Sequence, residues 1–343
     1  MKFLSCFLML LLCVSCSPSK VASHSPGTAR MSKLPMITVP VGRFLIDLPE
    51  QASFSFGRHT YNDAGDHICS FEAVGMEDLF ASVAAEAHKL ETAEKGDKSL
   101  LKLYNPGRMT ESQTIHYWKG PPDEAEVIWI KSFYWKEGLC AILEAPSEQD
   151  PAEIEKVEKS LDASFESLKP RTFSEIPTGP GFCIESAYFQ GEPPERPWEN
   201  ASIMVQLKDH PDIHLKFSTA TVDAYRGESD SLLFRMNPEH PPHIPESHDL
   251  RFRKRQVGPY RGEEVVSRVT ELNQTTGHTF QWEAMGPGES ATEPALTLQM
   301  VTGYGDPAVD SSLPEVDALA LWDRILDSIR YRGPLPPGSR KDL

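Results

Sequence analysis

The sequence lacks the short motifs that mark the common classes of enzyme. No Gly-x-Ser-x-Gly is present to position a serine nucleophile, and neither a phosphate loop nor a dinucleotide-binding glycine pattern occurs. Beyond residue 16, Cys-x-x-Cys pairs and His-Glu-x-x-His, which supply zinc ligands, are missing too. The 50 acidic residues are too many for one carboxylate pair to stand out as an acid and base. We therefore predict that the protein is not an enzyme and binds neither cofactor nor metal.

Basic residues are scarce beside acidic ones. The 343-residue chain has 34 Lys and Arg against 50 Asp and Glu, a formal net charge of −16. Binding to nucleic acid requires basic surface, so we predict no nucleic-acid partner. The same charge opposes attachment to anionic lipid and favours a basic protein partner. An acidic surface that serves only solubility is the alternative.

Long hydrophobic runs are confined to the N-terminus. Lys2 precedes the almost wholly apolar run Phe3–Val14, which is too short to cross a bilayer as a helix. This arrangement is typical of a secretory signal peptide, which we place at residues 1–15.

The signal peptide ends in a sequence that is similar to the cleavage box of bacterial lipoproteins. The residues are Cys13-Val14-Ser15-Cys16, with cysteine at the first position where that box prefers leucine. We predict that Cys16 is lipidated and that residues 16–35 form a lipid-anchored tether. Ser17 after the cysteine indicates the outer membrane, with the protein on its periplasmic side. A plain signal peptide cut nearby, or an uncleaved anchor, is the alternative.

Few cysteines remain after such processing. Cys69 and Cys140 both lie in apolar strand patterns, so they are the predicted disulfide pair, and Cys183 is left over. Buried free thiols are the alternative.

Residues 36–172 predict a first domain with strands and helices. Strand patterns occupy Ile37–Leu48, His67–Val74, Val127–Trp135 and Leu139–Leu143. Apolar residues at helical spacing predict helices over about 77–95 and 150–168. Asp150 is the expected cap of the second helix, because proline and a capping-box glutamate follow it.

Residues 173–180, rich in Pro and Gly, are the predicted linker to a second domain over 181–333. Its strand patterns occupy 182–184, 203–207, 213–217, 265–272, 279–284 and 295–301. We expect a short helix over 229–236, a loop over 237–249, a closing helix over about 312–329 and a polar tail over 334–343. The fold class is therefore α+β, with two domains that each have a mainly antiparallel sheet and a long closing helix.

Two groups of residues are candidate sites. His210, Asp212 and His214 lie within five residues, and His240, His243 and His248 follow in a later loop. Turn chemistry explains the first group without a metal, because Pro211 prevents a regular helix there. Arg261, Glu263 and Glu264 follow a tight Gly-Pro turn and are candidate charges for contacting a partner. A solvated hairpin end is the alternative.

Several segments carry a resemblance to a known family. They are Val41–Pro49, Gly181–Ile184, Gly262–Glu264, Trp282-Glu283 and Pro294–Val301 followed by Thr302-Gly303. In these segments the chain resembles the immunity proteins that protect bacteria from phospholipase effectors of the type VI secretion system. The resemblance covers nearly all of the mature chain. It implies a pincer-like, two-domain periplasmic lipoprotein that binds a cognate phospholipase effector and blocks access of lipid to it.

Two other functions remain open at the level of sequence. The first is an envelope hydrolase with a dispersed active site, for which His240, His243, Asp249 and Glu283 are the candidates. The second is a general ligand-binding or assembly lipoprotein of the envelope. Purified protein that turns over a substrate would favour the first, and capture of envelope components without a toxin would favour the second.

Overall fold

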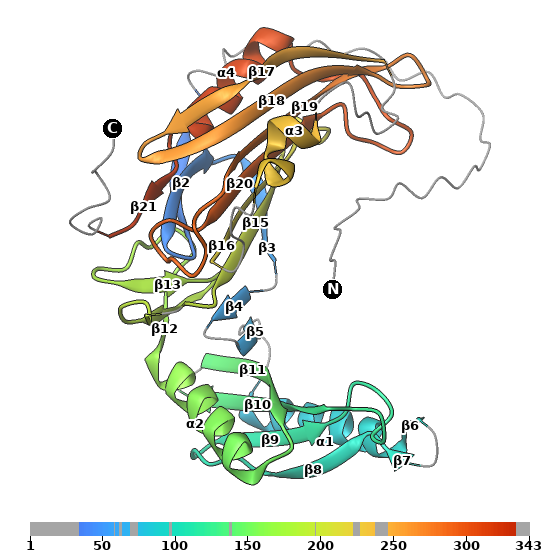
Figure 1. Ribbon diagram of the computed structural model, residues 1–343, viewed down its shortest axis with the longest axis vertical. Coiled ribbons are helices and arrows are strands. Elements are labelled where there is room, and N and C mark those ends of the chain that lie inside the picture. Colours follow the sequence, from blue (N-terminus) through green and yellow to red (C-terminus); the bar gives the residue numbers. More distant parts are fainter. Residues whose placement is uncertain are drawn as a thin grey trace.

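The computed structural model describes residues 34–57, 59–61, 64–68, 75–95, 98–136, 139–195, 197–221, 227–236 and 246–333. Antiparallel strands dominate it and a few helices pack against them, so the predicted α+β class with antiparallel sheets is confirmed. A 13-stranded sheet runs through most of the molecule in the order β17-β18-β19-β20-β16-β15-β4-β5-β11-β10-β9-β8, with β3 also pairing with β15. The molecule has the outline of a curved body with two lobes (Figure 1).

The upper lobe is built on the first part of that sheet. Its strands are β17 (Ser247–Val257), β18 (Tyr260–Thr270), β19 (Thr276–Ala284), β20 (Ala295–Thr302), β16 (His214–Ala220), β15 (Asn200–Leu207) and β3 (Ala52–Phe56). Helix α4 (Glu315–Leu326) packs on one face, where its Trp322 ring lies 5.4 Å from that of Phe280 on β19. The helix begins at Glu315 without a side-chain cap, so the predicted start at residue 312 is three residues early.

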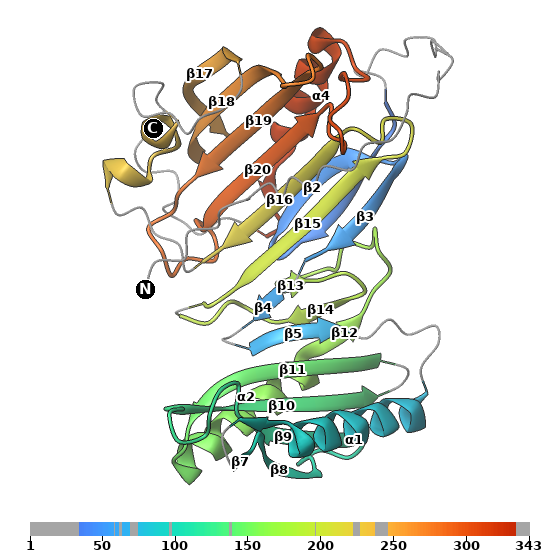
Figure 2. The ribbon, with the colours of Figure 1, turned by 90° about the vertical axis from the view of Figure 1, so that its right-hand side faces the viewer.

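The lower lobe places one helix on each face of its strands (Figure 2). The strands are β8 (Leu101–Pro106), β9 (Ser112–Tyr117), β10 (Val127–Lys136) and β11 (Leu139–Glu148). Because strand residues alternate, Phe133 on β10 packs with α1 (Met76–Thr92), whereas Tyr134 stacks on Phe165 of α2 (Pro151–Ser167) at 4.5 Å. The tiny strands β6 (Glu94–Lys95) and β7 (Lys98–Ser99) pair beside α1.

Short strands join the lobes. β4 (His59–Tyr61) and β5 (Ala64–Ile68) continue the large sheet, while β12 (Leu168–Pro170), β14 (Ala187–Gln190) and β13 (Gly181–Cys183) form a small sheet beside them. Tyr61 of β4 stacks on Phe189 of β14 at 4.1 Å, which ties the two sheets together. The predicted linker 173–180 is the connection between β12 and β13.

The first strands of the chain pair with its second half. β1 (Met36–Val41) pairs with β2 (Phe44–Pro49), β2 pairs with β21 (Arg330–Tyr331), and β3 pairs with β15. Residues 36–56 of the predicted domain 36–172 therefore belong to the upper lobe by their hydrogen bonds. The division at 173–180, with a long closing helix in each half, stays a prediction.

Strand β17 shows why a loop prediction over 237–249 was too long. β17 starts at Ser247, while residues 237–245 lie outside the described part of the chain. The strand has no apolar alternation, because the inward side chains Arg251, Arg253 and Arg255 meet carboxylates instead of a hydrocarbon core. A pattern that relies on hydrophobic alternation misses such an edge strand.

Candidate functional site

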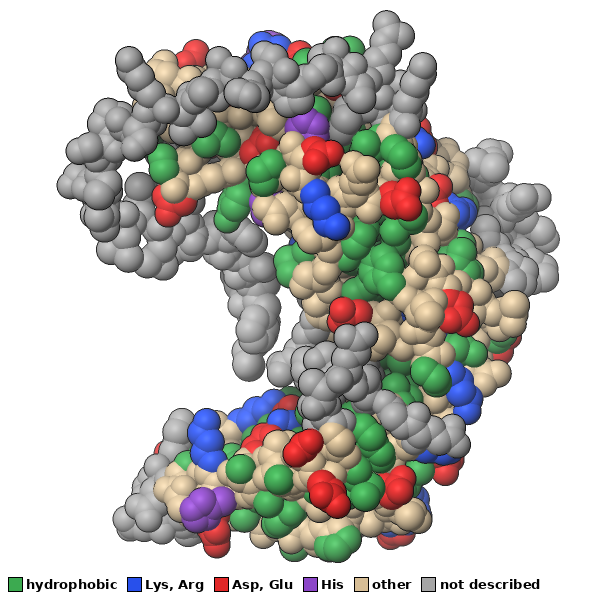
Figure 3. All heavy atoms as spheres, turned by 180° about the vertical axis from the view of Figure 1, so that it is seen from behind, with side chains coloured by type: hydrophobic (Ala, Val, Ile, Leu, Met, Phe, Trp, Pro, Cys, Tyr) green, Lys and Arg blue, Asp and Glu red, His purple; other side chains and the backbone are tan. Residues whose placement is uncertain are grey.

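The space between the two lobes is hollowed (Figure 3), and the upper sheet turns one face toward it (Figure 2). On this face, β15, β16, β20 and β19 bring their outward side chains into register, while Ile203, Phe217 and Leu298 point to the core. We call the outward set the concave face. It comprises Ser202, Met204, Gln206, His214, Lys216, Ser218, Thr279, Gln281, Glu283, Thr297, Gln299 and Val301.

The concave face is poor in charge for a protein in which 24% of residues are charged. Of its members, Lys216 and Glu283 carry a full charge with histidine neutral, and most of the others are Ser, Thr or Gln. Covering hydroxyl and amide groups costs less free energy than covering ions, and the centres of protein interfaces are depleted of charged residues. A polar face with few charges suits contact with another macromolecule better than chemistry on a small substrate.

One short helix rests on this side of the sheet. The 3₁₀ turn η2 (Glu228–Asp230) leads into α3 (Leu232–Arg235), which packs on β18 (Figures 1 and 2). Glu263 of β18 accepts hydrogen bonds from Ser231 Oγ at 2.6 Å and from the Leu233 amide at 3.0 Å. A carboxylate at this end of a helix satisfies an amide that has no partner within the helix.

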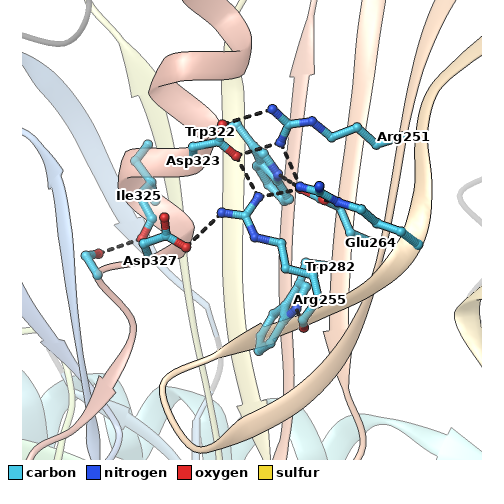
Figure 4. Close-up of polar contacts among 10 residues, drawn as sticks. Arg251, Arg255, Glu264, Trp282, Trp322, Asp323, Ile325 and Asp327 are labelled. Atoms are coloured by element: carbon cyan, nitrogen blue, oxygen red, sulfur yellow. Dashed lines mark hydrogen bonds and ion pairs between the residues drawn. The ribbon is translucent and has the colours of Figure 1, made fainter.

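The opposite face of β18 holds a buried ion cluster (Figure 4). Glu264, with a fully buried side chain, accepts hydrogen bonds from Arg255 Nη1 at 2.6 Å, Arg253 Nε at 2.6 Å and Trp322 Nε1 at 2.7 Å. Arg251 and Arg255 also bind Asp323 of α4. Burial alone would raise the pKa of the Glu264 carboxyl, but these donors outweigh it, and the pKa is lowered. The cluster fastens the β17–β18 hairpin to α4.

The three candidate contact residues therefore do not form one surface. Glu264 faces α4 and is committed to arginines, so it is not available to a partner and that candidate is corrected. Glu263, its neighbour, faces the concave side and holds α3. Arg261 is exposed at the start of β18. Alternation along the strand separates adjacent residues in this way.

The His210–His214 segment is a structural turn. The buried Asp212 carboxylate accepts hydrogen bonds from the Gly303 and Ser312 amides at 2.9 and 3.0 Å, and His210 Nδ1 lies 2.8 Å from Ser312 Oγ. Within the described ranges, three or more His, Cys, Asp or Glu side chains nowhere converge as a metal site would require. His248 is exposed on β17, and His240 and His243 lie outside the described residues.

Two of the candidates for a dispersed hydrolase, Asp249 and Glu283, lie among the described residues, and the fold does not bring them together. Asp249 accepts a hydrogen bond from Ser267 at 2.7 Å, whereas Glu283 lies opposite Glu263, four positions along β18. Glu283 is bonded to Arg235 of α3. Both carboxylates therefore have structural partners.

Two of the cysteines considered above, Cys140 and Cys183, lie among the described residues. Cys140 on β11 is disulfide-bonded, and Cys183 is free and buried. Cys69, the predicted partner, lies outside the described residues, but Ile68 before it pairs with Ala141 after Cys140. Cys16 is also outside them, and no helix in the described part of the chain is long and apolar enough to span a bilayer.

Comparison with known proteins identifies relatives. Residues 175–334 match the family described as Tle cognate immunity protein 4 C-terminal domain. The apo immunity protein TplEi of the type VI secretion system from Pseudomonas aeruginosa superposes with a TM-score of 0.71 and 24% identity, covering 88% of this chain and 99% of that one. The Tle4–Tli4 complex matches with a TM-score of 0.70 and 25% identity, covering 87% and 97%. TplEi bound to an "L" peptide matches at 0.66 and 24%, covering 87% and 98%. No curated protein shows a match to this chain.

Proposed function

Starting from the membership of residues 175–334 in the Tle cognate immunity protein 4 family, we propose that this chain binds and inhibits a cognate type VI secretion phospholipase effector. The family match is the observation that carries the proposal. It is supported by the fold, which extends the likeness over 87% of the chain to a structure described as a Tle4–Tli4 complex. The resemblance seen in the sequence is thereby confirmed, and the chain is an immunity protein relative.

Inhibition works by covering the effector and not by chemistry. The effector sits in the hollow against the concave face, and the two lobes flank it so that lipid no longer reaches its active site. The charge-poor face supports this arrangement because Ser, Thr and Gln lose little when water is removed. The net charge of −16 speeds capture of a basic effector, an effect that salt weakens.

The protein acts in the periplasm while anchored through Cys16 to the outer membrane. The described chain begins at Leu34, whose carbonyl accepts a hydrogen bond from Arg324 of α4 at 2.8 Å. The tether therefore joins the body on the α4 side, away from the concave face. Residues 17–33 would span at most about 60 Å when fully extended, so the anchor keeps the body close to the membrane.

The main test measures binding to the phospholipase encoded beside this gene. A catalytically inactive form of that enzyme is titrated with the soluble chain starting at residue 34, by calorimetry. We expect a stable complex with a dissociation constant well below micromolar and loss of lipid hydrolysis when the active enzyme is used. Folded proteins that fail to associate at micromolar concentration would refute the proposal. Lipid hydrolysis by the isolated chain would support the hydrolase alternative instead.

The anchor has a separate test. Cys16→Ala should prevent lipidation, so the protein leaves the membrane fraction or stays uncleaved, whereas Cys183→Ser should leave fractionation unchanged. Membrane retention of a correctly cleaved Cys16→Ala protein would contradict the anchor while leaving effector binding untouched.

A further inference from the structure

The segment Glu228–Arg235, formed by η2 and α3, is mounted on the concave side of the upper sheet. It sits over β18, and Leu232 is its buried side chain at 1% exposure. Such limited apolar burial would hold a two-turn segment only weakly. Leu233 and the adjoining Met236 are half-buried, and polar contacts add to this attachment.

Those contacts resolve an electrostatic conflict in the sheet. Glu263 and Glu283 are direct cross-strand partners on β18 and β19, and like charges in this relation destabilise a sheet. Glu263 receives the Ser231 hydroxyl and the Leu233 amide, while Glu283 receives the Arg235 guanidinium and the Gln281 amide. The segment thus supplies hydrogen-bond donors to both carboxylates and one positive charge, that of Arg235, and these contacts in turn fix its position.

The result is a fixed platform that presents Phe234. Leu232 points into the sheet, while Phe234, two residues later and therefore on the other side of α3, is 40% exposed. Glu228, at the start of the platform, is also exposed. A large aromatic side chain held on a rigid base loses little conformational entropy on binding, which is the property of residues that dominate interface energetics.

We propose that Phe234 is an anchor residue for the effector and that α3 is the element that sets its position. This inference rests on the proposed function and names the contact within it. The partner surface is an apolar depression bordered by basic side chains. The apolar part matches Phe234, and the basic border matches exposed Glu228 and the acidic character of the whole chain.

The test compares Phe234→Ala with a matched control, Val316→Ala. Val316 is 71% exposed on α4, on the opposite face of the sheet. With the inactive phospholipase encoded beside this gene as probe, Phe234→Ala should weaken binding at least ~30-fold, mainly through faster dissociation. Val316→Ala should bind as the parent chain does. Both variants should still unfold in one cooperative melting transition, which shows that any loss of affinity is measured on folded protein.

A second comparison separates positioning from contact. Ser231→Ala removes the hydroxyl that donates to Glu263 and accepts from the Phe234 amide, and it should weaken binding by several-fold in the parent chain. In the Phe234→Ala background it should have almost no further effect, since the anchor it positions is already gone. If the losses of binding free energy in the two single variants add fully in the double variant, the positioning role of Ser231 is overturned.

These measurements distinguish failure of the proposed function from failure of the Phe234 anchor. If the parent chain does not bind the phospholipase, the proposed function fails. If the parent binds and Phe234→Ala binds equally well, the anchor fails while the function stands. A Phe234→Ala protein that loses affinity only together with its melting transition would also overturn the anchor.

Discussion

Arg43 and Glu199 form a bidentate ion pair in the interior of the upper lobe. Arg43 Nε and Nη2 lie 2.7 and 2.5 Å from the two carboxylate oxygens, and each side chain is 3% exposed. Burial opposes the charge of Arg43, but the Glu199 carboxylate outweighs it and the pKa of the guanidinium is raised. The pair links the turn after β1 to the residue before β15, so it fixes the first strands of the chain against its second half.

Removal of one partner of this pair should be costly. Arg43→Ala leaves a buried carboxylate without its cation and should lower the free energy of unfolding by about 3–5 kcal/mol. Urea denaturation measures the change. Arg330→Ala is the control, because the Arg330–Asp47 pair is 45% and 35% exposed and should contribute about 1 kcal/mol or less. Equal losses in the two variants would contradict the special weight of the buried pair.

The cluster around Glu264 should be a stability element and not a binding element. Glu264→Gln leaves three arginines facing a neutral amide, and we expect a loss of about 3–5 kcal/mol in unfolding free energy. Affinity for the effector at a temperature where the variant is folded should change less than about tenfold. The exposed Glu246→Gln serves as control in both measurements. A large affinity loss with an unchanged urea midpoint would return Glu264 to the contact surface.

His59 should make the fold sensitive to acid. The ring is 5% exposed on β4, neither nitrogen has a hydrogen-bond partner among the described residues, and Phe56 lies 5.6 Å away. Burial, helped by the Arg171 charge, lowers the pKa of His59 from 6.5 to about 4. The unfolded chain therefore binds a proton at higher pH than the folded chain. The contribution of the neutral His59 ring to the free energy of unfolding is fully present above pH 6.5. It is lost as the pH falls toward 4, by roughly 3 kcal/mol in total.

A variant without the His59 ring tests the predicted dependence of stability on pH. His59→Leu should show a shallower fall of unfolding free energy between those pH values than the parent chain, measured by urea denaturation at each pH. His88→Gln changes a histidine that is 73% exposed and should follow the parent curve. Identical slopes for His59→Leu and the parent would show that His59 does not titrate differently on folding.

The disulfide of Cys140 should close onto Cys69. Non-reducing proteolysis followed by mass spectrometry should yield one peptide pair that joins these residues. After unfolding without reductant, the soluble chain starting at residue 34 should expose one reactive thiol, that of Cys183. Cys140→Ala should cost about 2–4 kcal/mol, since the bridge would close a loop of some seventy residues. A Cys183-containing bridge would contradict the assignment.

Local patterns predicted the helices well. α1 and α2 lie within a few residues of the expected spans, and Asp150 accepts hydrogen bonds from the Ala152 and Glu153 amides as its capping role required. Helical periodicity and capping depend on residues three or four apart, so the sequence carries them directly. Antiparallel hairpins such as β15–β16 follow from the same kind of short-range information.

The sequence by itself determined the main helices, the strands with apolar alternation, the α+β class, the missing catalytic motifs and the resemblance to immunity proteins. It grouped Arg261, Glu263 and Glu264 as contact candidates after a turn, and it did not place Glu263 and Glu264 on opposite sides of a strand. Only the tertiary structure decided which of the two meets α4 and which meets α3. The partners that make this choice are Trp322 for Glu264 and Ser231 for Glu263, and each lies more than thirty residues away along the chain. Side-chain burial and ion pairing at such distances depend on how the whole sheet folds against its helices, and no local spacing encodes them.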